Sequence, residues 1–200
     1  MVTVVSDMIW IAAERPTAGG LAVLWLVVRF IDTRPRFAFV AADAVDVVAD
    51  ATGGWALHAD WRNEPGQPLG DQVEARQTFQ SLVARHRLGG DRALIEVASL
   101  ARAADQASVP TPHPLGEAVR AIGRGALTVE GDDHWLVACG TFLYDAVYAY
   151  YRRSMVSREP PASSPAGGQS SARLPTGPDH WPLARLVPRR SATVRRWIRA

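Results

Sequence analysis

The sequence contains no lysine, so that all 22 of its basic residues are arginine. Either a guanidinium-based function or the base composition of a GC-rich genome accounts for this bias. Cys139 is the only cysteine, which excludes an intrachain disulfide and any metal site built from several thiolates. The opening MVTVVSDMIWIAAERP lacks the basic segment that precedes the apolar part of a secretory signal, so no such signal is expected.

Long hydrophobic runs are also missing. The apolar stretch Leu21 to Val28 is eight residues long and ends at Arg29, whereas a membrane-spanning helix needs about 20 residues. We therefore expect no membrane anchor and a cytoplasmic protein. The sequence has no Gly-rich phosphate loop, no HExxH and no GxSxG, so the common signals for nucleotide, zinc-protease and serine-hydrolase chemistry are absent.

Charge is unevenly distributed along the chain. Residues 1–154 hold 14 Arg and 18 acidic residues, a balance of −4, and residues 155–200 hold 8 Arg and 2 acidic residues, a balance of +6. The last part is rich in Pro, Gly and Ser before it becomes Arg-rich, which is typical of a linker and a largely disordered tail. Its end has the pattern of a short basic amphipathic helix for a membrane surface or nucleic acid; a solvated tail without specific function is the alternative.

The first half alternates strand and helix signals. Short apolar runs bounded by Pro, Gly or Arg predict strands at 8–13, 36–41 and 55–58. Residues 17–31 are apolar on nearly every side, which predicts a buried helix with Thr17 as its N-cap. A second helix is expected at 43–51, with Asp43 as its cap and Gly53-Gly54 as its end.

The second half has only helical signals. Segments with a spacing of about 3.6 residues, separated by Gly or Pro, predict helices at 74–86, 91–104, 115–124 and 132–153. The predicted fold class is therefore α/β (α+β): a small sheet with packed helices, followed by a mainly helical half. One domain is expected over residues 1–154.

Two charged residues lie on or beside the apolar face of the helix expected at 91–104. A rotation of about 100° per residue places Asp105 on that face and Arg102 at its edge. A charged group directed toward a core requires a partner or a ligand. An internal Arg–Asp pair or a helix-end cap is the structural alternative to a ligand site.

The last long helix shows two opposite stripes. One is polar and contains His134, Thr141, Asp145 and Tyr148, and the other is apolar and contains Trp135, Cys139, Phe142 and Ala146. The polar stripe is interpreted as the solvent side of a surface helix or, if it faces Arg102 and Asp105, as one wall of a polar pocket. Cys139 is expected to be a small core residue rather than a reactive thiolate.

His58 follows the third expected strand and precedes a loop rich in Gly, Pro and Asn. A histidine together with Asp residues supplies the donor types that bind a divalent metal ion. An ordinary side chain near a strand end is the alternative.

Taken in order, these segments resemble the C-terminal domain of the ChrB chromate resistance family, over roughly Met8 to Arg153. The stretch RPTAGGLAVLWLVVRFID matches the family pattern at Arg15, Pro16, Trp25, Leu26, Arg29, Phe30, Ile31 and Asp32. Gly19-Gly20 replaces the family's Asp-Arg, Val23 its Cys and Val28 the first Arg of a pair, and a second family Cys appears as Gln77. Later matches are Arg102 and Asp105 in SLARAADQ, and Asp132, Asp133, His134, Tyr144, Asp145 and Tyr148.

The resemblance implies a protein that accompanies a chromate efflux transporter and takes part in chromate sensing or tolerance. Chromate is a tetrahedral dianion, and Arg forks and helix N-termini bind such anions. It implies a ligand site at Arg29, Arg102 and Asp145 and a possible divalent metal at His58, Asp105 and His134. DNA binding belongs to an additional N-terminal domain of the family and is not expected here.

Three functions remain open at this point. The first is an accessory or sensor protein that binds an oxyanion or a metal without turnover. The second is a diverged family member that binds a partner through its basic tail. The third is a metal-dependent enzyme or a reductase, which the missing family thiols disfavour.

Overall fold

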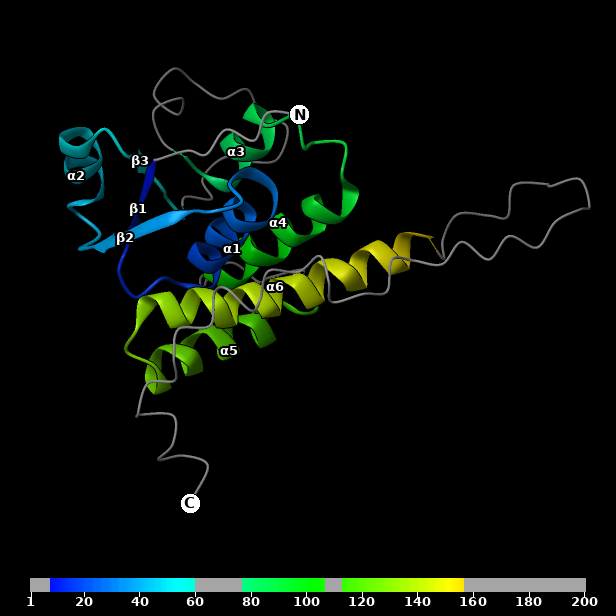
Figure 1. Ribbon diagram of the computed structural model, residues 1–200. Helices are drawn as coiled ribbons and strands as arrows, with labels where there is room; N and C mark the ends of the chain where they lie inside the picture. The colour runs from blue at the N-terminus through cyan, green and yellow to red at the C-terminus, as the bar shows by residue number, and fades with distance from the viewer. Residues whose placement is uncertain (1–7, 60–76, 107–112, 157–200) are drawn as a thin grey trace, which may run out of the picture.

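The computed structural model describes residues 8–59, 77–106 and 113–156, and these form a small parallel sheet with helices packed around it (Figure 1). The strands are β1 (Ile9–Ala13), β2 (Arg36–Val40) and β3 (Trp55–Ala56), in the order β2-β1-β3. In the register, Ile9 lies opposite Arg36 and Trp10 opposite Trp55. A further parallel bridge joins Leu57 to Gln77. The predicted α/β fold class is confirmed.

The apolar stretch after β1 forms α1 (Ala18–Leu26), which continues into a π-helical turn, η1 (Val27–Ile31). Thr17 is the N-cap, as predicted, and its Oγ1 accepts a hydrogen bond from Gly20 N at 3.1 Å. All residues of α1 except Gly20 are buried, which confirms the expected buried helix. The wider turn is closed by Asp32 N–H, which donates to Val27 O at 2.9 Å. Such π turns are frequent at functional sites.

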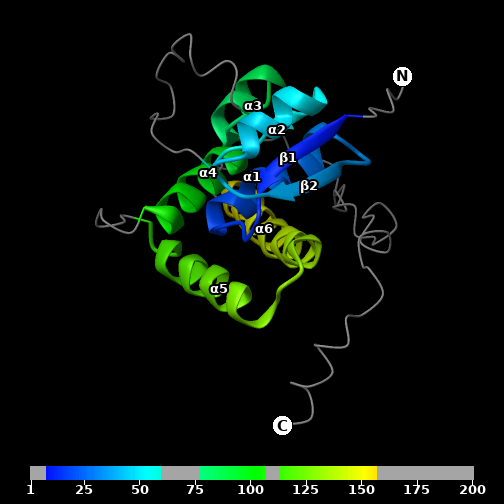
Figure 2. The same cartoon turned by 90° about the vertical axis from the view of Figure 1, so that its left-hand side faces the viewer.

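The sheet separates two hydrophobic cores. Successive side chains of a strand point to opposite faces, so Trp10 and Ala12 pack in the core of α1 while Ile11 packs against α2 (Val45–Thr52). Figure 2 shows α1 and α2 on opposite sides of the sheet. Gly53 ends α2 with a left-handed φ of 67°, as predicted. The predicted Asp43 cap is wrong, because Ala44 occupies the N-cap position without a side-chain bond.

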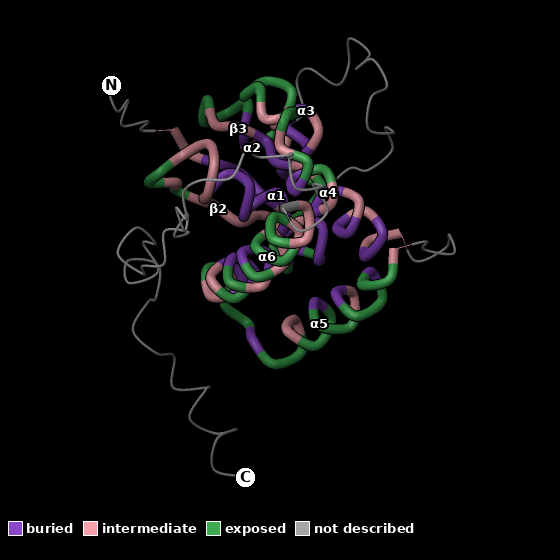
Figure 3. Tube along the Cα trace, turned by 90° about the vertical axis from the view of Figure 1, so that its right-hand side faces the viewer, coloured by how far each residue is buried: buried purple, intermediate pink, exposed green. Residues whose placement is uncertain are grey.

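The remaining described helices are α3 (Phe79–Arg85), α4 (Arg92–Asp105), α5 (Gly116–Val129) and α6 (Asp133–Val156). Helix α1 contacts α4, α5 and α6, and Figure 3 shows it buried among them. Helix α3 starts later than predicted, since Gln77 pairs with Leu57 and Thr78 forms a capping box with Ser81. Helix α5 runs through Gly125, where an added Cβ would meet no neighbour, so this glycine does not mark its end.

Of the two orientations left open for the polar stripe of α6, the structure shows the inward one, toward Trp25 and Arg29. Its polar stripe faces inward, with Thr141 1% and Asp145 5% exposed. Its apolar stripe faces outward, with Phe142 66% exposed. The prediction of Cys139 as a core residue is wrong, since it is exposed. The reason is that the inner neighbour of α6 presents buried N–H donors, which an apolar face would leave without acceptors.

Two further expectations concern a membrane-spanning segment and the C-terminal tail. Among the described helices, none is both long and apolar enough to cross a membrane. The expected linker and Arg-rich tail fall almost entirely on residues 157–200, outside the described ranges.

Candidate functional site

The first polar cluster joins η1 and α6 around the Asp145 carboxylate. Arg29 Nε donates to Asp145 Oδ1 at 2.9 Å, and Arg29 Nη2 donates to Oδ2 at 2.5 Å. Trp25 Nε1 donates to the same Oδ1 at 2.9 Å. The side chains of Arg29 and Asp145 are only 13% and 6% exposed. The geometry is the two-pronged fork that makes Arg–carboxylate pairs strong.

This pairing has a consequence for ligand binding. Two of the predicted ligand residues, Arg29 and Asp145, are brought together, but they neutralise each other. An oxyanion bound to the same edge of the guanidinium would have to displace a buried carboxylate, which would then lose its compensating charge.

An aromatic wall flanks the cluster. The rings of Trp25, Phe30 and Tyr148 lie 5.4–5.7 Å apart in edge or tilted arrangements. Tyr148 donates its hydroxyl proton to Asp91 Oδ2 at 2.5 Å. Burial and this bond to a carboxylate raise the pKa of Tyr148. The wall holds η1 against α6 and fixes the orientation of Trp25.

The second polar cluster lies at the N-terminus of α1. Gly19 N donates to Asp105 Oδ1 at 2.8 Å, and Thr17 Oγ1 donates to Asp105 Oδ2 at 3.0 Å. Tyr144 of α6 donates to Ala18 O at 2.6 Å. Burial and the nearby Asp105 charge raise the pKa of Tyr144 far above its ordinary value. Asp105 is thus a cap for another helix, the alternative that the sequence left open.

This cluster lies at the carboxyl ends of β1 and β3. Helix α1 follows β1 on one face of the sheet, and α2 precedes β3 on the other face. The order in which the chain adds strands to the sheet therefore reverses between β1 and β3, which makes this edge a topological switch point. A Cβ added to Gly20 would lie 3.9 Å from Ala59 Cβ, so the segment after β3 reaches the first turn of α1. In open α/β sheets, ligands bind in the crevice at such a switch point, where a helix N-terminus favours anions.

A comparison with protein families supplies the deciding observation. The model of the ChrB C-terminal domain matches residues 10–151 of this chain. This chain belongs to the ChrB C-terminal domain family. It is therefore related to chromate resistance. Comparisons with curated proteins and with solved structures give no match.

The ChrB resemblance also includes Arg15, whose role here is structural. Its φ is 54°, in the left-handed region. Its guanidinium donates to the carbonyl oxygens of Leu127 and Glu130, and its N–H donates to Asp133 Oδ1 at 3.0 Å. Arg15 thus caps the C-terminus of α5 and ties the β1–α1 loop to the start of α6.

The third predicted ligand residue, Arg102, is half-buried on α4, one turn before Asp105. Its Nε donates to Gln106 Oε1 at 3.2 Å. Arg102 is therefore on the same helix end as Asp105, close to the second cluster and on a different helix from Arg29.

The predicted metal ligands of this ChrB domain are not brought together. His58 Nε2 lies 2.8 Å from Asp46 Oδ1 of α2, Asp105 caps α1, and the exposed His134 packs edge-on against Phe39 at 5.0 Å. Within residues 8–59, 77–106 and 113–156, no three His, Cys, Asp or Glu side chains are close enough to hold a metal ion.

Two residues that donate hydrogen bonds in the site were not predicted from the sequence to do so. Trp25 and Tyr144 both agree with the ChrB pattern, yet neither was assigned a role. The available signal is chemical: a Trp or Tyr in an otherwise apolar helix must direct its N–H or O–H to an acceptor. Trp25 is four residues before Arg29, on the same side of the helix.

Proposed function

We propose that this protein is an accessory or sensor protein of chromate resistance that binds an oxyanion without turnover. The observation that carries the proposal is the ChrB family match over residues 10–151. Functional association with a chromate transporter belongs to the same proposal. The absence of the family's thiols from positions 23 and 77 supports binding over thiol-based reduction.

The proposed site is the N-terminus of α1 together with Arg102. Support comes from the switch-point position and from the Gly19 N–H in the first turn of α1, which already donates to a carboxylate, Asp105. An oxyanion there would compete with Asp105, whereas Arg29 is engaged by a buried partner. Binding would therefore release Asp105 and change how α4 is held to α1, which gives a physical basis for sensing.

The test is a calorimetric and thermal-shift titration of the full chain with chromate and sulfate. A ligand at 100 times its Kd stabilises the folded state by about 2.7 kcal/mol. Arg102→Gln is expected to abolish the shift. Arg124→Gln is the matched control, because Arg124 is exposed on α5 and the change removes the same charge; it should bind like the wild type.

Asp105→Ala separates an oxyanion from a metal. Removal of a competing negative charge should tighten chromate binding several-fold, whereas removal of a metal ligand should weaken binding of Mn²⁺, Zn²⁺ or Fe²⁺. No shift with chromate or sulfate in a folded protein, or equal losses in Arg102→Gln and Arg124→Gln, would contradict the proposed site.

A further inference from the structure

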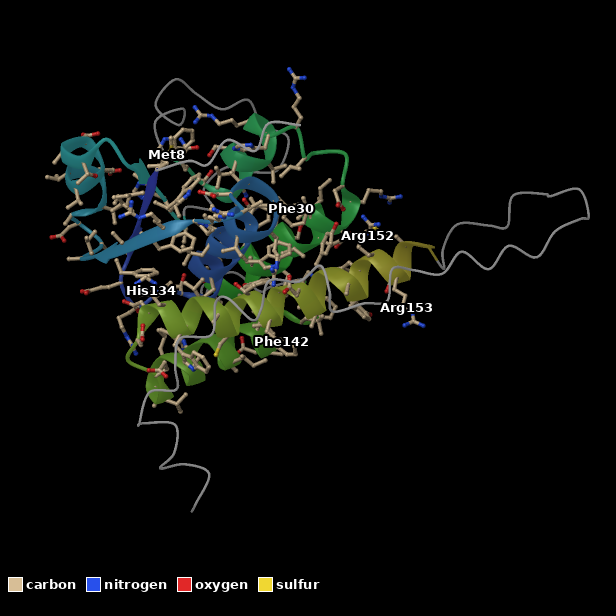
Figure 4. All side chains as sticks on the ribbon, in the orientation of Figure 1. Met8, Phe30, His134, Phe142, Arg152 and Arg153 are labelled. Carbon is tan, nitrogen blue, oxygen red and sulfur yellow. The ribbon has the colours of Figure 1, made fainter. Side chains whose placement is uncertain are left out.

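The outer face of α6 carries a continuous apolar stripe. Its residues follow one another at intervals of three or four, namely Trp135, Cys139, Phe142, Ala146 and Tyr150. Phe142 is 66% and Tyr150 59% exposed, Trp135 is half-buried, and Cys139 and Ala146 are exposed. Figure 4 shows Phe142 and Arg153 on the edge of α6 away from the sheet, and His134 and Arg152 on the edge toward it.

Within the described residues, none of the five stripe residues belongs to either hydrophobic core. The opposite side of α6 already packs on α1 and α4, and it contains the residues of the polar clusters. From Trp135 to Tyr150 the stripe is about 22 Å long, at 1.5 Å per residue. A contiguous apolar surface of this kind is characteristic of an interaction site.

The stripe and its flanking charges are arranged with two-fold self-complementarity. In an antiparallel helix pair whose two-fold axis passes between Phe142 and Leu143, residues equally distant from that point lie opposite each other. Trp135 then faces Tyr150, and Cys139 faces Ala146. The small residues between the aromatic rings allow the two helices to approach closely.

The charges obey the same symmetry. Asp132 is exposed at the start of α6, and Arg153 is exposed near its end, in line with Phe142. In the antiparallel pair these two residues lie opposite each other, and each such contact occurs twice, as an isologous interface requires. A parallel pair would instead place like charges together.

We propose that the outer face of α6 is a homodimer interface, in which α6 packs antiparallel on α6 of a second copy of this chain. Phe142 lies at the centre of the interface, and the Asp132–Arg153 pairs lie at its two ends. The proposal does not depend on oxyanion binding, because the polar clusters lie on the inner side of α6.

The test is the mass of the full chain by sedimentation equilibrium over a wide range of concentration. Wild type is expected to show a dimer of twice 21.7 kDa. Phe142→Asp, which places two charges at the two-fold axis, should raise the dissociation constant at least about 100-fold. Val47→Asp is the matched control, since Val47 is 68% exposed on α2; it should leave the dimer unchanged.

Cys139 supplies a second measurement, because it is the only cysteine of the chain. In the proposed pair the two Cys139 residues are about 10 Å apart along the helices, on axes about 8–10 Å apart. A short bis-maleimide should therefore give a covalent dimer with wild type and Val47→Asp, and none with Phe142→Asp. A chain that is monomeric at every soluble concentration would overturn the proposal. A dimer unaffected by Phe142→Asp would overturn it equally, by placing the interface elsewhere.

Discussion

The two faces of α6 depart from the ordinary arrangement of a surface helix, because the inner face adds buried polar groups to core residues such as Leu136 and Val137. The inner face holds Asp145, Thr141 and Tyr144, all buried, and the outer face exposes Phe142 and Tyr150. An amphipathic helix normally directs its apolar side to the core. The inner face makes specific polar contacts to α1 and η1, and the outer face is the one that we propose for association.

The largest expected effect tests the inner face. Asp145→Ala removes the buried carboxylate that accepts from Arg29 and Trp25 Nε1, and loss of one partner of a buried pair costs about 3–5 kcal/mol. The free energy of unfolding, measured by urea denaturation, should fall by this amount. Asp46→Ala is the control: Asp46 is the half-exposed partner of His58, and its loss should cost less than about 1 kcal/mol.

A double variant sharpens the same comparison. Arg29→Met with Asp145→Leu removes both charges and retains apolar volume, so it should be more stable than Asp145→Ala alone. If the double variant is the less stable of the two, the inner face depends on the ion pair itself rather than on the avoidance of an unpaired charge.

The sequence allows much of this fold to be predicted, for reasons that are local. The apolar run before Arg29, the cap at Thr17 and the stop at Gly53 depend on neighbours within a few residues, and their elements were predicted within a few positions. The orientation of α6 depends instead on Trp25 and Arg29, about 120 positions away in the chain. Two opposite stripes predict a helix, but they do not show which stripe faces the core. Here the polar stripe faces the core because its Asp145 accepts hydrogen bonds from buried donors on Trp25 and Arg29.

The same difference between local and long-range contacts applies to the candidate site. Helical geometry correctly placed Asp105 on the inward side of α4, where it is half-buried, because that depends only on α4. It did not identify the partners Thr17 and Gly19, which a different part of the chain supplies. His58, Asp105 and His134 have suitable donor chemistry, but their separation in space is a property of the sheet and the helix order, which spacing along the chain does not encode.

A smaller effect is expected at Tyr144, and it depends on pH. Tyr144→Phe removes the hydrogen bond to Ala18 O, which should cost about 1 kcal/mol at neutral pH. Folding raises the pKa of Tyr144, so the folded state holds this proton more tightly than the unfolded state. The contribution of protonated Tyr144 to the free energy of unfolding is fully present below the pKa of the unfolded state, about 10. This contribution is lost as the pH rises above that value.

The measurement is the difference in unfolding free energy between wild type and Tyr144→Phe as a function of pH. The other tyrosines titrate in both proteins, so the difference reports Tyr144 alone. It should be constant up to about pH 9 and should decrease above about pH 10. A difference that is independent of pH would mean that Tyr144 titrates alike in the folded and unfolded states.

The smallest expected effect is a gain in stability rather than a loss. It distinguishes polar groups of the inner face that have a hydrogen-bond partner from those that have none. Thr141 Oγ1 is buried and, in the part of the chain that the structure describes, has no hydrogen-bond partner. Thr141→Val replaces that hydroxyl by a methyl group of the same shape, so it should stabilise the protein by about 1 kcal/mol. Thr78→Val makes the same chemical change at a capping hydroxyl and should destabilise by about 1 kcal/mol. Urea denaturation of both variants compares the two signs directly. If Thr141→Val also destabilises, its hydroxyl has an acceptor in solution, and the inner face of α6 is polar because every one of its polar groups is used.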